Sequence, residues 1–169
     1  MALVLNTNSY VSIADADTYF ETRIDSANWF DATDEIKEQA LVTATHIVDD
    51  HTWIGSAVSS SQALAWPRKN AVYHDKRLGT TVSILDSEIP TKVKNAVYEQ
   101  ALHLVDNENV LTQQTQTFES ISVGSISLTD SNGDVTRIPR KPSSVTLLLR
   151  PLVHRGGMGG AGAMWWRAN

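Results

Sequence analysis

Two segments of the chain repeat apolar residues every three or four positions, and this spacing is the strongest constraint that the sequence places on the fold. The first segment is DEIKEQALVTATHIVDDH, which starts at Asp34. The second begins at Pro90, a residue that suits the first position of a helix. Their apolar positions are Ile36, Ala40, Ala44, Ile47 and Val48, and then Val93, Val97, Ala101, Leu104 and Val105. The pattern predicts two amphipathic helices, the second ending near Asn107.

Shorter helices are expected on either side of this pair. Ser12 and Asp15 have the spacing of a capping box, and the apolar residues that follow predict a helical stripe of Ile13, Ala16, Phe20 and Ile24. Near the other end, VTLLLRPLV predicts a short helix that stops at Pro151. Residues 54–89 have no clear period, and we expect a long irregular connection there.

The period changes from helical to alternating in the segment TFESISVGSISLTDSNGDVTRI. We expect one strand through Ile121 to Leu128 with a bulge or kink at Gly124-Ser125, a tight turn at Asn132-Gly133, and a returning strand over 135–138. A hairpin with one apolar face is too small to be stable alone. The residues expected to contact a neighbouring subunit are Phe118, Ile121, Val123, Ile126 and Leu128.

The last fifteen residues, RGGMGGAGAMWWRAN, hold five of the nine glycines. Residues 157–162 fit the G-x-G-x-x-G pattern, but a phosphate-binding loop follows a strand and opens a helix, and no helix of useful length can follow here. The composition instead predicts a flexible tether. Its end would anchor to another subunit or to a partner protein through Met164, Trp165, Trp166 and Arg167. The alternatives are a tail that folds onto its own core or one that is disordered.

Composition and charge exclude several classes of function. The 169 residues include no cysteine, so disulfides and thiolate metal sites are ruled out, and we expect neither a signal peptide nor a membrane-spanning helix. Residues 1–50 carry ten acidic and two basic side chains, whereas residues 51–169 carry nine acidic and twelve basic ones. This distribution argues against nucleic-acid binding through bulk charge, and it suits head-to-tail contacts between copies or a solvated acidic face.

No catalytic, cofactor or metal motif stands out. His46 and Asp50 lie one helical turn apart, but no third or fourth ligand accompanies them, and we expect no enzyme, no cofactor and no metal. One segment could contact single-stranded DNA, because aromatic residues alternate there with cations that can stack on and pair with nucleotides. Its residues are Trp66, Arg68, Lys69 and Tyr73, with Lys76 and Arg77 nearby. The alternative is that Trp66 packs in the core while Arg68 makes an ion pair.

Taken in order, these segments resemble a known family. YVSIADADTYFETR, ALVTATHIVDDHTWIG, QALAWPR, IPTKVKNAVYEQALHL, FESISVGSISLT and LLLRPLV are similar to the head–tail connector adaptors, or head completion proteins, of tailed bacteriophages. Some members carry the label of DnaT-like single-stranded-DNA-binding protein. The resemblance covers roughly residues 10–153, and QALAWPR with the downstream IP is its most specific part.

The resemblance implies a mainly α fold, a small helical bundle with an inserted β-hairpin and an extended tail. We expect an adaptor domain over 1–153, with the hairpin at about 117–139, and a glycine-rich tail over 154–169. Such a protein is a structural virion component that assembles in the host cytoplasm and ends in the viral neck. It would form a ring with itself, typically dodecameric, dock on the portal protein and contact the tail or stopper protein. Genomic double-stranded DNA would pass through the lumen without sequence-specific binding, and no membrane is involved. The alternative is a single-stranded-DNA-binding replication accessory protein that uses Trp66, Arg68, Lys69 and Tyr73.

Overall fold

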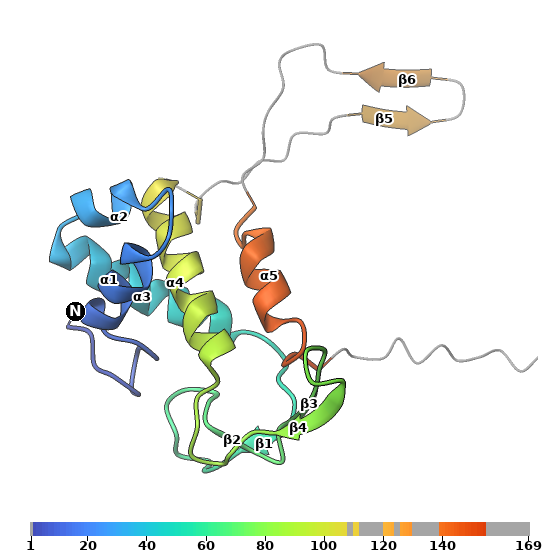
Figure 1. The fold of residues 1–169 in the computed structure, drawn as a ribbon. Coiled ribbons are helices and arrows are strands. Elements are labelled where there is room, and N and C mark those ends of the chain that lie inside the picture. The colour runs from blue at the N-terminus through green and yellow to red at the C-terminus, as the bar shows by residue number, and fades with distance from the viewer. Residues whose placement is uncertain (1, 108–109, 112–119, 124–125, 130–138, 155–169) are drawn as a thin grey trace, which may run out of the picture.

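Helices dominate the fold, which is seen in a computed structural model that describes residues 2–107, 110–111, 120–123, 126–129 and 139–154 (Figure 1). The helices are α1 (Ile13–Glu21), α2 (Ala27–Asp31), α3 (Asp34–Asp49), α4 (Thr91–Asp106) and α5 (Ser143–Leu149). The strands are β1 (Ser56–Ala57), β2 (Arg68–Lys69), β3 (Val72–Asp75), β4 (Thr80–Ser83), β5 (Ser120–Val123) and β6 (Ile126–Thr129). The mainly α fold class is therefore confirmed at this level.

The first helix begins as its sequence predicts. The side chain of Ser12 accepts a hydrogen bond from the backbone N–H of Asp15, and the Asp15 carboxylate accepts one from the Ser12 backbone, so the capping box is complete. The hydrogen bonds that the Asp15 carboxylate accepts, first from the Ser12 hydroxyl and then from the Ser12 backbone N–H, hold the pKa of Asp15 below its usual value. The helix ends at Glu21, and Ile24, which we expected on its buried stripe, is 83% exposed. That expectation was wrong because the helix stops one turn earlier.

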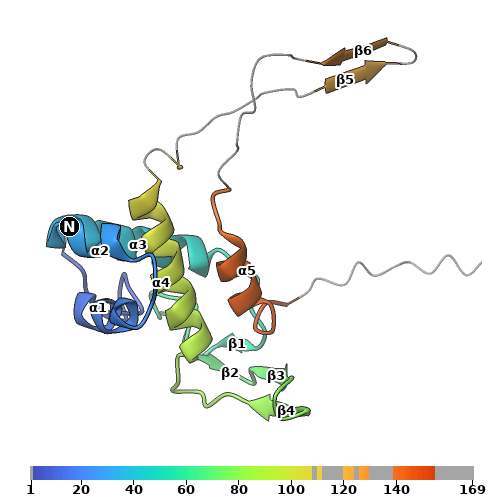
Figure 2. The same ribbon diagram turned by 45° about the horizontal axis from the view of Figure 1, so that its top comes forward.

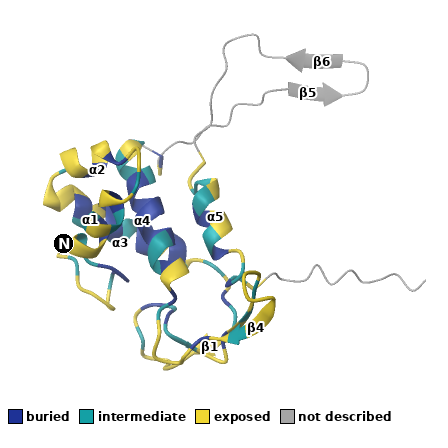
Figure 3. Ribbon diagram, viewed as in Figure 1, coloured by how far each residue is buried: buried dark blue, intermediate teal, exposed yellow. Residues whose placement is uncertain are grey.

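The core forms where α4 packs between its neighbours (Figure 3). α4 contacts α3 over most of its length and also contacts α5 and α2. It starts after Pro90 and ends before Asn107, as predicted. The largest side chains enclosed by these helices include Trp29, Tyr10, Phe20, Leu41, Leu149 and Leu152.

The C-terminal end of α5 is joined to the segment that follows α3. Trp53 and Val153 form an isolated antiparallel bridge, in which Ile54 donates its N–H to the carbonyl of Leu152 (3.0 Å) and His154 donates to Thr52 (2.7 Å). This bridge brings the end of the described chain to the side of the molecule that carries β1 to β4 (Figure 2).

The connection over residues 54–89 is more ordered than we expected. It contains two small antiparallel sheets, β1 with β2 and β3 with β4. The prediction of an irregular segment was wrong because these strands are only two to four residues long and mostly exposed, so the sequence holds no alternating apolar run long enough to indicate a strand. The β3–β4 hairpin is closed by Asp75, whose carboxylate accepts hydrogen bonds from the backbone N–H groups of Arg77 and Leu78, and by Gly79 at a φ of +65°.

The inserted hairpin also differs from its prediction. β5 and β6 pair with each other, with Ile121 opposite Leu128 and Val123 opposite Ile126. The chain therefore reverses between Val123 and Ile126, and the expectation of one bulged strand through this segment was wrong. The break in the alternating pattern therefore marks the boundary between two paired strands. The predicted turn at Asn132-Gly133 and strand 135–138 lie outside the described residues.

In the ranges that the structure describes, no helix has the length and apolar character required to cross a membrane.

Candidate interaction surfaces

The Trp66-Pro67-Arg68 corner, proposed from sequence as a DNA contact, is part of the protein's interior. Trp66 is 2% exposed and packs edge-to-face against Trp53, with ring centroids 5.6 Å apart. Its backbone N–H donates to the hydroxyl of Tyr10 (3.0 Å), and that hydroxyl in turn hydrogen-bonds the carboxylate of Asp49. The Trp66 ring is thus enclosed by protein, and a nucleotide base has no access to stack on it.

Arg68 is occupied by backbone carbonyls. Its Nε donates to the carbonyl of Ile54 (2.8 Å), Nη1 to Ala65 (3.2 Å) and Nη2 to Gly55 (2.9 Å). The predicted ion pair of Arg68 was wrong, because the guanidinium donates to three neutral carbonyl groups instead of a carboxylate. Arg68 therefore holds the β1–β2 corner together.

The other two residues of the predicted DNA contact remain accessible. Lys69 is exposed on β2, and Tyr73 is half-buried on β3, where its hydroxyl donates a long hydrogen bond of 3.4 Å to Asp75. Tyr73 faces a different environment from Trp66, because it lines a cavity of about 630 Å³. The structure thus separates the four residues instead of joining them in one surface.

That cavity, here called the cationic groove, lies between the tip of the β3–β4 hairpin, the start of α4 and the end of α5. Its basic residues come from three separate parts of the chain: His74, Lys76, Arg77, Lys92, Arg150 and His154. All six are exposed, and in the described part of the chain none of them takes part in an ion pair. The groove's one carboxylate is Asp75, whose pKa is lowered chiefly by the hydrogen bond from the Arg77 backbone. The groove is therefore positively charged at neutral pH.

Sequence reasoning found only half of the cationic groove. Tyr73, Lys76 and Arg77 were noticed as neighbours in the chain, but Lys92 belongs to α4 and Arg150 directly follows α5, and no local signal links these two. Only the packing of α4 against α5 brings these two residues to the same side of the molecule, and the sequence does not show that packing.

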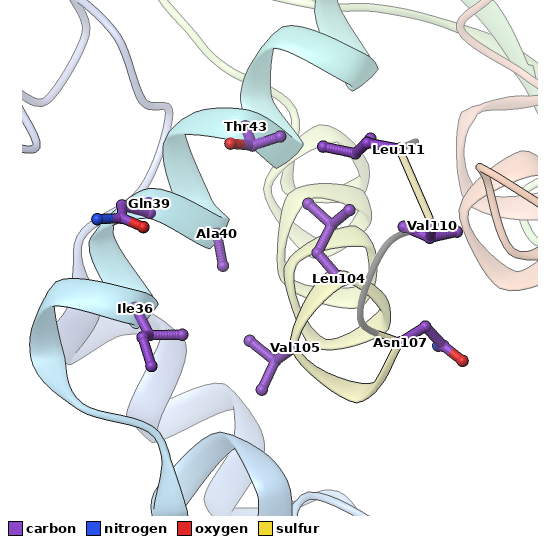
Figure 4. A pocket seen from close by; sticks show the side chains of 9 residues that line it. All are labelled: Ile36, Gln39, Ala40, Thr43, Leu104, Val105, Asn107, Val110 and Leu111. Carbon is purple, nitrogen blue, oxygen red and sulfur yellow. The ribbon is translucent and has the colours of Figure 1, made fainter. Parts of the chain in front are cut away.

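A second cavity, here called the apolar groove, lies between α3 and α4 and has a volume of about 340 Å³ (Figure 4). Ile36 and Ala40 of α3 stand across from Leu104 and Val105 of α4 in the close-up. The remaining lining residues are Gln39, Thr43, Asn107, Val110 and Leu111. Ile36 and Leu111 are each about half exposed, at 47% and 51%. Apolar side chains of this size in a shallow groove are typical of a surface that receives another segment.

Two basic residues of the helical part of the molecule, Arg23 after α1 and Lys37 of α3, are paired with acids. Arg23 donates two hydrogen bonds to Glu99 (2.8 and 3.0 Å), and Tyr19 donates a third to the same carboxylate (2.8 Å). Burial, followed by this bond to Glu99, raises the pKa of Tyr19 to about 12.

The second basic residue of this region, Lys37, is buried and lies 3.3 Å from Asp17. Its ammonium group also lies over the ring of Trp29 (5.6 Å). Lys37 is therefore engaged, while Asp34 and Glu35 at the start of α3 and Asp106 at the end of α4 are exposed, so the described residues next to the groove carry more acidic than free basic side chains.

The other predicted interaction residues cannot be placed. Phe118 and the tail residues Met164, Trp165, Trp166 and Arg167 lie outside the described residues, and for Ile121, Val123, Ile126 and Leu128 only the strand pairing is described. Over the described ranges, no group of three or more histidine and acidic side chains comes together as a metal site.

Comparison with known proteins gives one informative match. The sequence model of a family described as "Putative DnaT-like ssDNA binding protein" matches residues 2–168, which is nearly the whole chain. Neither the curated proteins nor the solved structures contain a match to this sequence.

Proposed function

The chain belongs to this family of putative DnaT-like ssDNA-binding proteins. We propose that it works by assembly, as a head–tail connector adaptor of a tailed bacteriophage. It forms a ring with its own copies, docks on the portal protein and links the portal to the tail or stopper protein while extending the DNA channel. The protein is not an enzyme.

The observation that carries this proposal is the apolar surface that a single chain leaves open. The apolar groove exposes half of Ile36 and half of Leu111, and no third described strand joins the β5–β6 pair. A two-stranded sheet gains stability when a further strand or another surface covers it. Both features suit a protein whose copies complete one another.

The interior role of the Trp66-Pro67-Arg68 corner also supports assembly over DNA binding at that corner. Trp66 is buried and Arg68 is bonded to three carbonyls, so these residues support the fold. The sequence segment with the most specific resemblance to the adaptors, QALAWPR, therefore has a structural reason for its composition.

Light scattering on the full chain mixed with purified portal protein tests the proposal. We expect the chain to elute with the portal at a mass well above that of the portal alone. If the chain elutes separately at the mass of one copy across the accessible concentration range, the adaptor role is refuted.

A second candidate function is single-stranded-DNA binding, which the family description names and which the cationic groove favours. Lys76, Arg77 and Arg150 are exposed along its rim, and Tyr73 offers an aromatic ring on its wall. Cations that follow a phosphate backbone next to a stacking ring are the usual elements of such a site.

Fluorescence anisotropy with a labelled single-stranded oligonucleotide tests this candidate. Removing three phosphate contacts in the variant Lys76→Ala/Arg77→Ala/Arg150→Ala should reduce the slope of log affinity against log salt by about 2. The matched control is Lys69→Ala/Lys94→Ala/Arg140→Ala, which removes the same charge from outside the groove. Equal losses in the two variants would eliminate the groove as a specific site.

A further inference from the structure

The apolar groove between α3 and α4 has a definite chemical character. Its lining is mainly aliphatic. Among residues 34–43 of α3 and 99–107 at the end of α4, the one lysine or arginine is Lys37, and it is paired with Asp17. Glu35 lies next to Ile36 at the start of α3, and Asp106 follows Val105 at the end of α4, and both acids are exposed. A matching occupant would be an apolar segment with a positive charge beside it.

The C-terminal segment of this chain has that character. Met164, Trp165 and Trp166 are consecutive large apolar residues, and Arg167 follows them directly. Each tryptophan can bury roughly 150–250 Å² when it enters an apolar site. No other position in the sequence has two adjacent tryptophans. The positive charge of Arg167 complements the exposed acids Glu35 and Asp106, here called the acidic rim of the groove.

The groove and the origin of the tail lie at opposite ends of α4. His154, the last described residue, lines the cationic groove together with Lys92 in the first turn of α4, whereas Leu104 and Val105 in its last turn line the apolar groove. Twelve helical residues separate Lys92 from Leu104, which is about 18 Å along the axis.

Chain length therefore favours a groove on another copy. A glycine-rich stretch of the length from Arg155 to Met164 has a root-mean-square span of about 17 Å. Reaching the groove of its own chain would take all of that average span along the helix axis alone, so the stretch would have to extend well beyond its average to pass around the helices as well. A second copy beside the first has no such restriction.

We propose that residues 164–167 of one copy bind in the apolar groove of a neighbouring copy, with the tryptophan pair against Ile36 and Leu104 and Arg167 beside the acidic rim. The inference deepens the proposed adaptor function, because it names the contact that joins adjacent subunits. Repeated around a closed ring, such a contact can be individually weak, since each docked tail raises the effective concentration of the next.

Disulfide trapping tests this contact cleanly, because the chain has no cysteine of its own. Full-length Gln39→Cys, at the groove, is mixed with full-length Ala168→Cys, beside the tail anchor, and oxidised. We expect a crosslink between the two chains at several-fold higher yield than with Ser60→Cys, an exposed control in the loop after β1. Equal yields at positions 39 and 60 would overturn the proposal.

Two further variants separate the chemistry from mere proximity. In the Ala168→Cys chain, Trp165→Ala/Trp166→Ala should abolish the excess crosslink, and Arg167→Glu should reduce it several-fold. Arg155→Glu makes the same charge change far from the anchor, and its yield should stay unchanged. An excess that survives the loss of both tryptophans would also overturn the proposal.

The same reagents distinguish docking between copies from docking within one. A chain carrying both Gln39→Cys and Ala168→Cys, oxidised at high dilution, should remain largely uncrosslinked. Efficient closure within that chain, with no crosslink between the mixed single variants, would refute a contact between subunits. The trapping experiment contains no portal protein, so it is independent of the portal-binding test. A crosslink between copies together with no binding to the portal would refute the adaptor role and leave the contact between copies intact.

Discussion

At the scale of single residues, the fold requires a close approach of two backbone segments that only glycine allows. Gly55 has a φ of +70°, and a Cβ placed there would lie 2.4 Å from the carbonyl oxygen of Lys69 and 2.9 Å from the backbone nitrogen of Ala71. Its own carbonyl accepts a hydrogen bond from Arg68. Gly55 therefore lets β1 approach β2 at the corner that Trp66 and Arg68 complete.

We predict that Gly55→Ala lowers the free energy of unfolding by about 3 kcal/mol, because left-handed strain adds to a backbone clash. Gly79→Ala is the matched control, since Gly79 also has a positive φ, of +65°, but nothing lies within 4 Å of an added Cβ. It should cost only about 1 kcal/mol. Urea unfolding of both variants checks this, and equal costs would mean that the close approach at Gly55 is not a constraint.

Two tyrosines predict how stability depends on alkaline pH. Burial, followed by the bond to Glu99, raises the pKa of Tyr19 to about 12, and burial raises that of Tyr98 to about 12 as well, from 10.0 in each case. Above pH 10 the unfolded chain loses these protons while the folded chain keeps them, so the free energy of unfolding should fall between pH 10 and pH 12. The decline should be shallower in Tyr19→Phe/Tyr98→Phe, and an unchanged slope would contradict the assignment.

At the scale of elements, the helices were predictable and the short strands were not. α3 and α4 each repeat apolar residues over sixteen positions, and the core requires that repeat, so sequence alone located both. The strands β1 to β4 are held by local devices, such as the Asp75 turn and the guanidinium of Arg68, which leave little trace in the hydrophobic pattern. The apolar groove and half of the cationic groove were missed because their residues come together only when separate elements pack.

The β1–β2 corner gives a test at this scale. Arg68→Ala leaves the carbonyls of Ile54, Gly55 and Ala65 without their donor, and we expect the free energy of unfolding to fall by about 2 kcal/mol. Its exposed neighbour in the same strand provides the control, because Lys69→Ala should change stability by no more than about 0.5 kcal/mol. If instead both variants are equally stable, Arg68 is free for an external ligand and the interior role assigned to it is wrong.

At the scale of the whole molecule, charge and apolar surface are unevenly distributed. The apolar groove and the cationic groove lie at opposite ends of α4, so one copy presents different chemistry at its two ends. A head-to-tail arrangement lets unlike surfaces meet and closes into a ring when the rotation between copies permits it. The proposed adaptor function and the proposed tail contact both follow from this asymmetry.

The most direct measurement is the number of copies of this chain in purified phage particles, obtained by quantitative mass spectrometry with the portal protein as the internal standard. We expect a fixed number of copies per particle, in constant ratio to the portal and of the size of one ring. Particles that contain the portal but none of this chain would contradict its assembly into the virion neck.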